Sequence, residues 1–235
     1  MRFVITIIGY TVGLPLELLV IAALVRGPYR QFPAVFAYSL ADFFSTVIEL
    51  PLAIDYFRNY ASTGVHHPFV FWYWLDEVVL QFLVFIVVLS LIWQATSEAR
   101  SRRPLRLGLI LGSLLVAGIS FLIQYDPHVL TGLWMTPWAS EMSFASAILD
   151  LFLWALLIAK RQKDPRVLML SGGLGIMFAG EATGEALRNM SRSVVLAGGI
   201  LMVFTHLAFL YVWWQTLRAH RSFPASPLPA PRTDP

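Results

Sequence analysis

Long apolar stretches separated by short polar segments run along almost the whole chain. A membrane-spanning helix needs about 20 mostly apolar residues, because each residue advances the helix by about 1.5 Å through an apolar layer about 30 Å thick. Seven stretches of the sequence meet this length. The pattern therefore predicts an all-α, polytopic membrane bundle of seven transmembrane helices. Their approximate bounds are 3–25, 33–56, 69–95, 105–124, 141–160, 166–188 and 193–217.

The distribution of Lys and Arg predicts the orientation of this bundle. The segments that follow the first, third, fifth and seventh stretches contain 13 of the 17 Lys and Arg residues, and the other segments contain four. Basic loops are retained in the cytoplasm. We therefore expect the N-terminus outside and the C-terminus inside. Residues 1–218 would form the transmembrane domain, and the proline-rich tail 219–235 would be disordered in the cytoplasm.

Composition supports a lipid environment and removes several kinds of chemistry. Hydrophobic residues make up 57% of the chain and charged residues only 13%, about half the usual charged share of a soluble domain. Cysteine is absent, which excludes disulfides, thiolate metal sites and cysteine nucleophiles. Several tryptophans fit the aromatic belts of a membrane interface. We place Trp138 in the loop before the fifth helix, and Trp213 and Trp214 at the inner end of the seventh.

Known intramembrane activities need residues that this sequence lacks. A retinal protein needs a lysine inside its last helix, but no predicted span has an interior lysine. Zinc hydrolases and haem-binding bundles need several intramembrane histidines, and only His206 lies inside a span. His66, His67 and His128 lack further metal ligands nearby. We therefore expect no cofactor, no metal centre, no nucleic-acid partner and no catalytic residue, and the sequence leans away from an enzyme.

Carboxylic acids inside the predicted spans are the unusual feature of the chain. Each is costly in an apolar layer and is expected to face the bundle interior or a hydrated cavity. Their only basic neighbours in the sequence pattern are His206 and, at an outer end, Arg188, so the acids cannot all be ionised and paired. The intramembrane acids are Glu17, Asp42, Glu49, Asp76, Glu77, Asp150, Glu181 and Glu185.

Helical spacing places many of these polar residues on common faces. One face of the second helix holds Ser39, Asp42, Thr46 and Glu49. On the sixth helix, Glu181 lies one turn before Glu185. We expect Glu49, Glu77, Glu181 and His206 to line one hydrated cavity that opens outward. The candidate ligand or proton site comprises Asp42, Glu49, Asp76, Glu77, Asp150, Glu181, Glu185 and His206. The alternative is that the acids are neutral hydrogen-bonding groups that join helices.

Small residues on the sixth helix predict close helix packing. Two pairs of small residues are each four positions apart: Ser171 with Gly175, and Gly180 with Gly184. This spacing lets helix backbones approach each other. We expect this face to pack inside the bundle rather than to form a dimer.

Two segments resemble a group of uncharacterised bacterial seven-helix membrane proteins. They are Tyr-Arg-Gln-Phe-Pro-Ala-Val-Phe-Ala-Tyr at 29–38 and Phe-Trp-Tyr-Trp-Leu-Asp-Glu at 71–77. The resemblance implies a location in the bacterial inner membrane and carries no established activity. The layout is more distantly similar to the seven-helix sensory regions of bacterial histidine kinases. A signalling role would then need a separate cytoplasmic signalling protein, because this chain has no kinase region.

Three functions are compatible with the pattern. A receptor-like sensor would bind a proton, a cation or a small ligand in an outward-facing acidic cavity. A proton- or cation-coupled carrier would use acids near the membrane centre and proline-broken helices. An intramembrane enzyme that modifies lipids would use His206 with Asp150 or Asp42 as an acid–base pair. The lipid bilayer is the partner that all three share.

Overall fold

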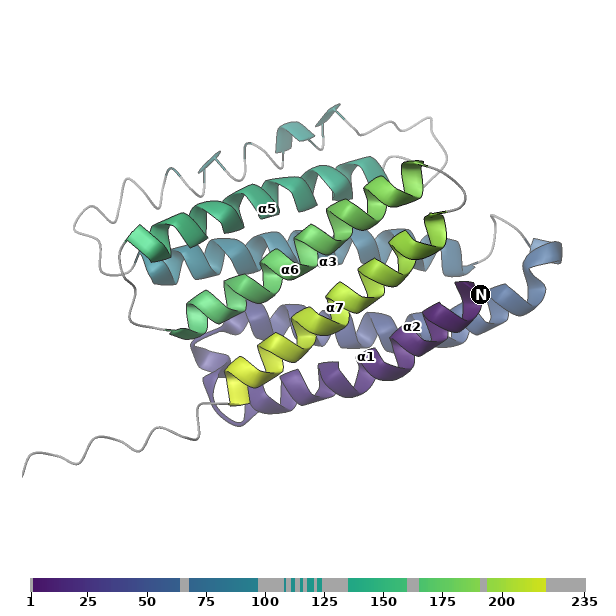
Figure 1. The fold of residues 1–235 in the computed structure, drawn as a ribbon, viewed down its shortest axis with the longest axis horizontal. Helices are drawn as coiled ribbons and strands as arrows, with labels where there is room; N and C mark the ends of the chain where they lie inside the picture. Colours follow the sequence, from purple (N-terminus) through teal and green to yellow (C-terminus); the bar gives the residue numbers. More distant parts are fainter. Residues whose placement is uncertain are drawn as a thin grey trace, which may run out of the picture.

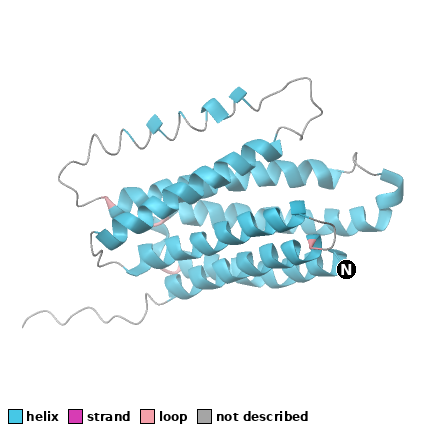
Figure 2. Ribbon diagram, turned by 45° about the horizontal axis from the view of Figure 1, so that its top comes forward, coloured by secondary structure: helices cyan, strands magenta, loops and turns pink. Residues whose placement is uncertain are grey.

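A computed structural model describes 2–63, 68–96, 108, 111–112, 115, 118–120, 122–123, 135–159, 165–190 and 194–218. Within these residues the chain is helical and contains no strand (Figure 2). The long helices are α1 (Arg2–Val25), α2 (Pro33–Thr63), α3 (Pro68–Ala95), α5 (Met135–Ala159), α6 (Pro165–Met190) and α7 (Val195–Arg218), and a 3-10 turn, η1 (Pro28–Arg30), joins α1 to α2. Most of the predicted span 105–124 and the whole tail 219–235 lie outside the described residues.

Six helices in the described part of the chain are long and apolar enough to cross a membrane. Large apolar side chains point away from the bundle: Leu151 is 71% exposed and Phe204 is 68% exposed. Polar side chains such as Glu17 and Asp150 are instead 2% exposed. A surface that is apolar outside and polar residues that turn inward are expected in lipid, and the chain is a multi-pass membrane protein by this criterion.

The six long helices form a closed ring. α1 packs against α2 and α7, α3 packs against α2 and α5, and α6 packs against α5 and α7. α1, α3, α5 and α7 run in one direction along the bundle, and α2 and α6 run in the other (Figure 1). The starts of α1, α3, α5 and α7 therefore lie at the same end as the last turns of α2 and α6. We call this the α1-start end, and we call the other the α7-finish end.

Apolar packing is concentrated in the half of the bundle toward the α7-finish end. The buried cluster there joins the last turns of α1, α3, α5 and α7 to the first turns of α2 and α6. Its largest fully buried members are Trp213, Phe32, Phe209 and Leu24. This half is consequently filled by close-packed apolar side chains, which we call the apolar plug. Most of the intramembrane acids lie instead toward the α1-start end.

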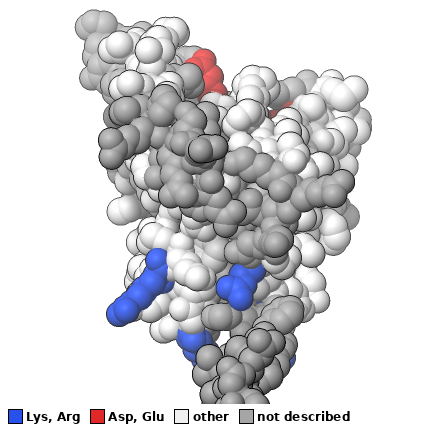
Figure 3. All heavy atoms as spheres, turned by 90° about the vertical axis from the view of Figure 1, so that its left-hand side faces the viewer, with Lys and Arg blue, Asp and Glu red and all other residues white. Residues whose placement is uncertain are grey.

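Basic residues surround the α7-finish end. Arg26 directly follows α1, Arg166 lies in the first turn of α6, and Arg218 is the last residue of α7. Figure 3 views the molecule from this end and shows Lys and Arg side chains in the lower part of the view. It is the end that the basic loops predict to be cytoplasmic.

Close contact between α6 and α7 depends on glycines of α6. A Cβ atom on Gly180 would lie 1.9 Å from Thr205 Oγ1, and one on Gly184 would lie 2.3 Å from Met202 Cγ. Only glycine fits where the neighbouring helix approaches so closely. The prediction that these small residues serve packing within the bundle is confirmed for Gly180 and Gly184.

Two helix bounds and two tryptophans differ from the sequence prediction. α2 continues to Thr63 rather than ending near 56, and α5 begins at Met135 rather than near 141. Trp138 therefore lies within α5 and is 8% exposed, and Trp213 is fully buried, with its Nε1–H donating to the Leu170 carbonyl at 2.9 Å. The prediction that these two side chains form interfacial belts was wrong, because the helix faces that hold them turn inward.

Candidate functional site

An acidic cavity of about 480 Å³ lies among α3, α5, α6 and α7, in the half of the bundle toward the α1-start end. The acids of α3 and α6 point into it from positions near the start of α3 and near the finish of α6. Serines of α5 and the Gln81 amide add hydrogen-bonding groups. The polar residues that line the cavity are Tyr73, Asp76, Glu77, Gln81, Ser140, Ser143, Glu181 and Glu185.

Glu181 is the best-anchored acid of this cavity. Ser143 Oγ donates to Glu181 Oε2 at 2.9 Å, and Gln81 Nε2 lies 3.4 Å from the same oxygen. These contacts join α3, α5 and α6 through one carboxyl group. Because both neighbours are neutral, they orient the carboxylate without cancelling its charge.

Arg188 lies at the margin of the cavity. It is one turn beyond Glu185 on α6, and its Nη1 is 3.8 Å from Met202 Sδ. Among the described residues, none of those that line the cavity is basic. The cavity therefore carries an excess of negative charge and favours a cation over an anion.

Glu49 lies in a second, smaller cavity of about 160 Å³ between α2 and α3. Tyr10 of α1 donates its hydroxyl proton to Glu49 Oε2 at 2.8 Å. Asp76 lines this cavity as well as the larger one. The two cavities are thus neighbours that share one acid.

The polar stripe predicted on α2 is confirmed. Ser39 is 1% exposed, Asp42 is 4%, Thr46 is 8% and Glu49 is 6%. Thr46 Oγ1 donates to Glu17 Oε1 on α1 at 3.1 Å. The stripe therefore faces the inside of the ring and is held against α1.

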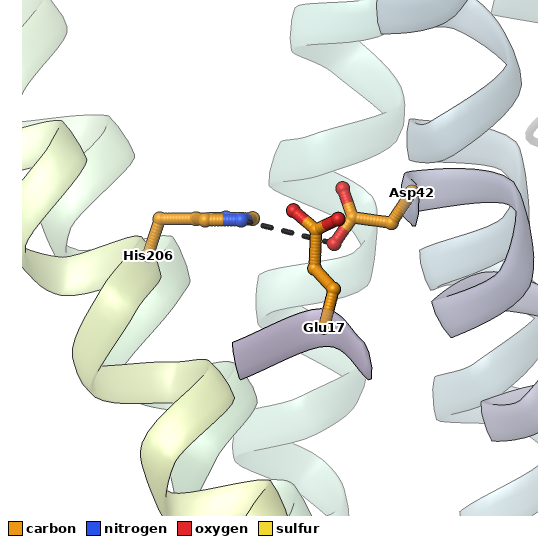
Figure 4. Close-up of side chains that lie close together, drawn as sticks. All are labelled: Glu17, Asp42 and His206. Atoms are coloured by element: carbon orange, nitrogen blue, oxygen red, sulfur yellow. Dashed lines mark ion pairs between the residues drawn. The ribbon is translucent and has the colours of Figure 1, made fainter. Parts of the chain in front are cut away.

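Three ionisable side chains converge where α1, α2 and α7 meet, as Figure 4 shows. His206 Nε2 is 3.7 Å from Asp42 Oδ2. One ligand-type atom from each of Glu17, Asp42 and His206 lies within 4.8 Å of the other two. The sequence-based site included Asp42 and His206 but omitted Glu17. The spacing of polar residues within α1 does not predict that α1 packs against α7.

Several buried carboxylate oxygens in the described part of the chain have no hydrogen-bond partner. Glu17 Oε2 and Asp42 Oδ2 are among them, and so are Glu49 Oε1 and Asp76 Oδ1. A buried polar atom without a partner costs about 1–3 kcal/mol. These oxygens are therefore available to a proton, a water molecule or a bound cation.

Asp150 is separate from this arrangement. It is 2% exposed, and it accepts a hydrogen bond of 2.6 Å from Ser171 Oγ on α6. Its contact joins α5 to α6, whereas the carboxylates that face His206 are Asp42 and Glu17. The acid–base pair considered from the sequence thus has Asp42 and not Asp150 beside the imidazole.

The structure divides the predicted cavity set among three places. Glu77 and Glu181 share the large acidic cavity, Glu49 lines the smaller one, and His206 belongs to the cluster with Asp42 and Glu17. Asp76 adjoins both cavities, and Glu185 lines the large one. No family model, curated protein or solved structure matches the chain.

Proposed function

We propose that this protein is a receptor-like sensor of the bacterial inner membrane whose acidic cavity binds a small cationic ligand from outside. The observation that carries the proposal is the cavity of about 480 Å³ lined by Asp76, Glu77, Glu181 and Glu185. Its size suits a small organic molecule, and its charge selects a cation. The aromatic ring of Tyr73 in the lining adds a face on which an ammonium group packs favourably.

The orientation belongs to the same proposal. Seven spans with the N-terminus outside put the acidic cavity on the outer side and the arginines of the α7-finish end in the cytoplasm. This agrees with the retention of basic loops inside. A ligand would then reach the cavity directly from outside the cell.

The apolar plug favours a sensor over a carrier. A carrier must open its site alternately to both sides. The half of the bundle toward the α7-finish end, however, is filled by Trp213, Phe209 and Phe32. A sensor needs only a small shift of helices around its ligand. The contact of Gly180 and Gly184 with α7 lets such a shift pass between α6 and α7. A separate cytoplasmic signalling protein would receive it.

Cation binding to the full chain in lipid nanodiscs tests the proposal. We expect tetraethylammonium chloride to raise the thermal unfolding temperature saturably, above sodium chloride at equal ionic strength. Sodium benzenesulfonate, an organic anion, should have no such effect. Glu181→Gln and Glu77→Gln should weaken tetraethylammonium binding by about ten- to a hundredfold, since a contact to a charged group contributes about 1.5–3 kcal/mol.

Asp55→Asn is the matched control, because Asp55 is an exposed acid of α2 outside the cavity lining. It should bind tetraethylammonium like the wild type. Equal responses to the organic cation and anion, or unchanged binding in both glutamine variants, would refute the proposal. Saturable uptake of tetraethylammonium into proteoliposomes would instead favour the carrier alternative.

A further inference from the structure

The cluster of Glu17, Asp42 and His206 has a geometry that an ordinary hydrogen-bonded contact does not explain. The 3.7 Å between His206 Nε2 and Asp42 Oδ2 exceeds the length of a hydrogen bond, which ends at about 3.2 Å. A tetrahedral metal ion bound at about 2.0–2.1 Å separates its ligand atoms by about 3.3–3.4 Å. The 3.7 Å pair is close to this separation, and all three ligand atoms lie within 4.8 Å of one another, so a small approach of the side chains would complete a coordination site.

Burial makes the two carboxylates unusual. Glu17 is 2% exposed and Asp42 is 4% exposed. Glu17 Oε2 and Asp42 Oδ2 nevertheless lack a hydrogen-bond partner in the part of the chain that the structure describes. Both carboxylates turn toward the His206 imidazole (Figure 4). Two unpartnered, buried carboxylate oxygens that converge with an imidazole nitrogen are the donors that a cation would satisfy.

The surroundings hold these donors in place. Thr46 Oγ1 donates to Glu17 Oε1 at 3.1 Å, which leaves Oε2 free to turn into the cluster. The ring of Phe209 packs beside that of His206, with centroids 5.8 Å apart. Hydrogen bonds from outside a metal site orient its carboxylate ligands in this way.

Charge balance also favours a divalent ion. The ionised forms of Glu17 and Asp42 would bring two negative charges beside a neutral imidazole. In the described part of the chain, the charged neighbours of Glu17 are Asp42, His206 and Asp76, and none of them is a lysine or an arginine. A dication would neutralise the pair without requiring either carboxylate to take up a proton.

We propose that Glu17, Asp42 and His206 bind one divalent first-row transition-metal ion where α1, α2 and α7 meet. Mixed nitrogen and oxygen donors suit Zn²⁺ and its neighbours, whereas Mg²⁺ and Ca²⁺ prefer oxygen alone. The His206 side chain is 35% exposed, which leaves room for water as a further ligand. The site would tie α1 and α2 to α7. It is separate from the acidic cavity, because none of its three ligands lines either described cavity.

Metal titration of the full chain in nanodiscs tests this site. The protein is purified without a histidine tag and stripped with a chelator, and Co²⁺ and Zn²⁺ are then added separately. We expect one high-affinity ion per chain and a visible Co²⁺ absorption band that Zn²⁺ abolishes. Asp42→Asn and His206→Gln should each weaken binding by more than about a hundredfold, since loss of an outer hydrogen-bond partner alone costs ten- to a hundredfold. Glu17→Gln keeps an acceptor for Thr46 and should weaken binding while preserving the fold.

Two matched variants decide where the ion binds. Asp150→Asn changes another buried acid outside the cluster and should leave Co²⁺ binding intact. A variant in which His66, His67, His128 and His220 are all replaced by Asn should also bind one ion. Absence of stoichiometric binding in the wild type would overturn the proposal and assign protons to the carboxylates. Binding that survives Asp42→Asn or disappears with the other histidines would overturn it as well.

The metal site and the cation cavity can fail independently. Glu181→Gln should lose tetraethylammonium binding but keep the Co²⁺ band, and Asp42→Asn should do the opposite. The unfolding temperature of each stripped variant, compared with that of the stripped wild type, identifies any variant that is simply misfolded. For such a variant, the substitution of another ligand of the cluster takes its place.

Discussion

Single polar residues inside this bundle have two different surroundings. Asp150 is satisfied by Ser171, and Glu181 by Ser143 and Gln81. Each of these contacts joins neighbouring helices through one carboxyl group. Glu17 and Asp42 each keep a buried oxygen without a partner. The difference lies in the neighbouring helix: a serine or an amide faces the first kind, and another ionisable group faces the second.

Trp213 provides a prediction at the residue scale. Its side chain is fully buried, and Nε1–H donates to the Leu170 carbonyl at 2.9 Å. We expect Trp213→Phe to lower the free energy of unfolding in mixed micelles by about 2–3 kcal/mol, from the lost hydrogen bond and the space left behind. Trp214→Phe is the control, because Trp214 is only partly buried, and it should cost less than about 1 kcal/mol. Equal losses would contradict the core position of Trp213.

At the scale of elements, hydropathy located most helix bounds closely, and the exceptions are the end of α2 and the start of α5. The predicted starts of the first, second, third and sixth helices lie within one residue of those observed. Hydropathy marks the part of a helix that matches an apolar layer, but a helix once formed propagates into polar residues. α2 therefore continues past Asp55 to Thr63, and α5 begins before Pro137, since proline is tolerated in the first turn of a helix.

The α6–α7 contact provides a prediction at this scale. We expect Gly180→Ala to destabilise the protein by about 1–3 kcal/mol, because the added methyl group meets Thr205 and overpacks the contact. Gly199→Ala on α7 is the matched control. A Cβ atom there meets nothing within 4 Å, so the higher helix propensity of alanine should leave stability unchanged or raise it by up to about 1 kcal/mol. Unfolding in mixed micelles measures both. A loss in Gly199→Ala as large as that in Gly180→Ala would contradict overpacking of the α6–α7 contact as the cause.

At the scale of the whole molecule, the sequence predicted which faces are polar but not which faces meet. The α2 stripe and the inward turn of the acids follow from spacing and from the cost of charge in lipid. The meeting of Glu17 with His206 requires the first and last long helices to be neighbours, and spacing within one helix carries no information on that order. For the same reason the expected single cavity is divided. Glu49 on α2 and Glu181 on α6 lie on helices that do not adjoin in the ring.

The charge difference between the two ends of the bundle gives the last prediction. Arg26, Arg166 and Arg218 gather at the α7-finish end, and translocation of clustered basic residues is disfavoured. We expect a reporter that is active only in the cytoplasm to work when it is fused after Arg221. A reporter that is active only outside should work in the segment near Thr131. Neutral replacement of the basic segment that contains Arg100, Arg102, Arg103 and Arg106 should weaken this orientation more than neutral replacement of Arg188 and Arg192. The opposite reporter pattern would turn the acidic cavity toward the cytoplasm, and the sensor proposal would then require a ligand from inside the cell.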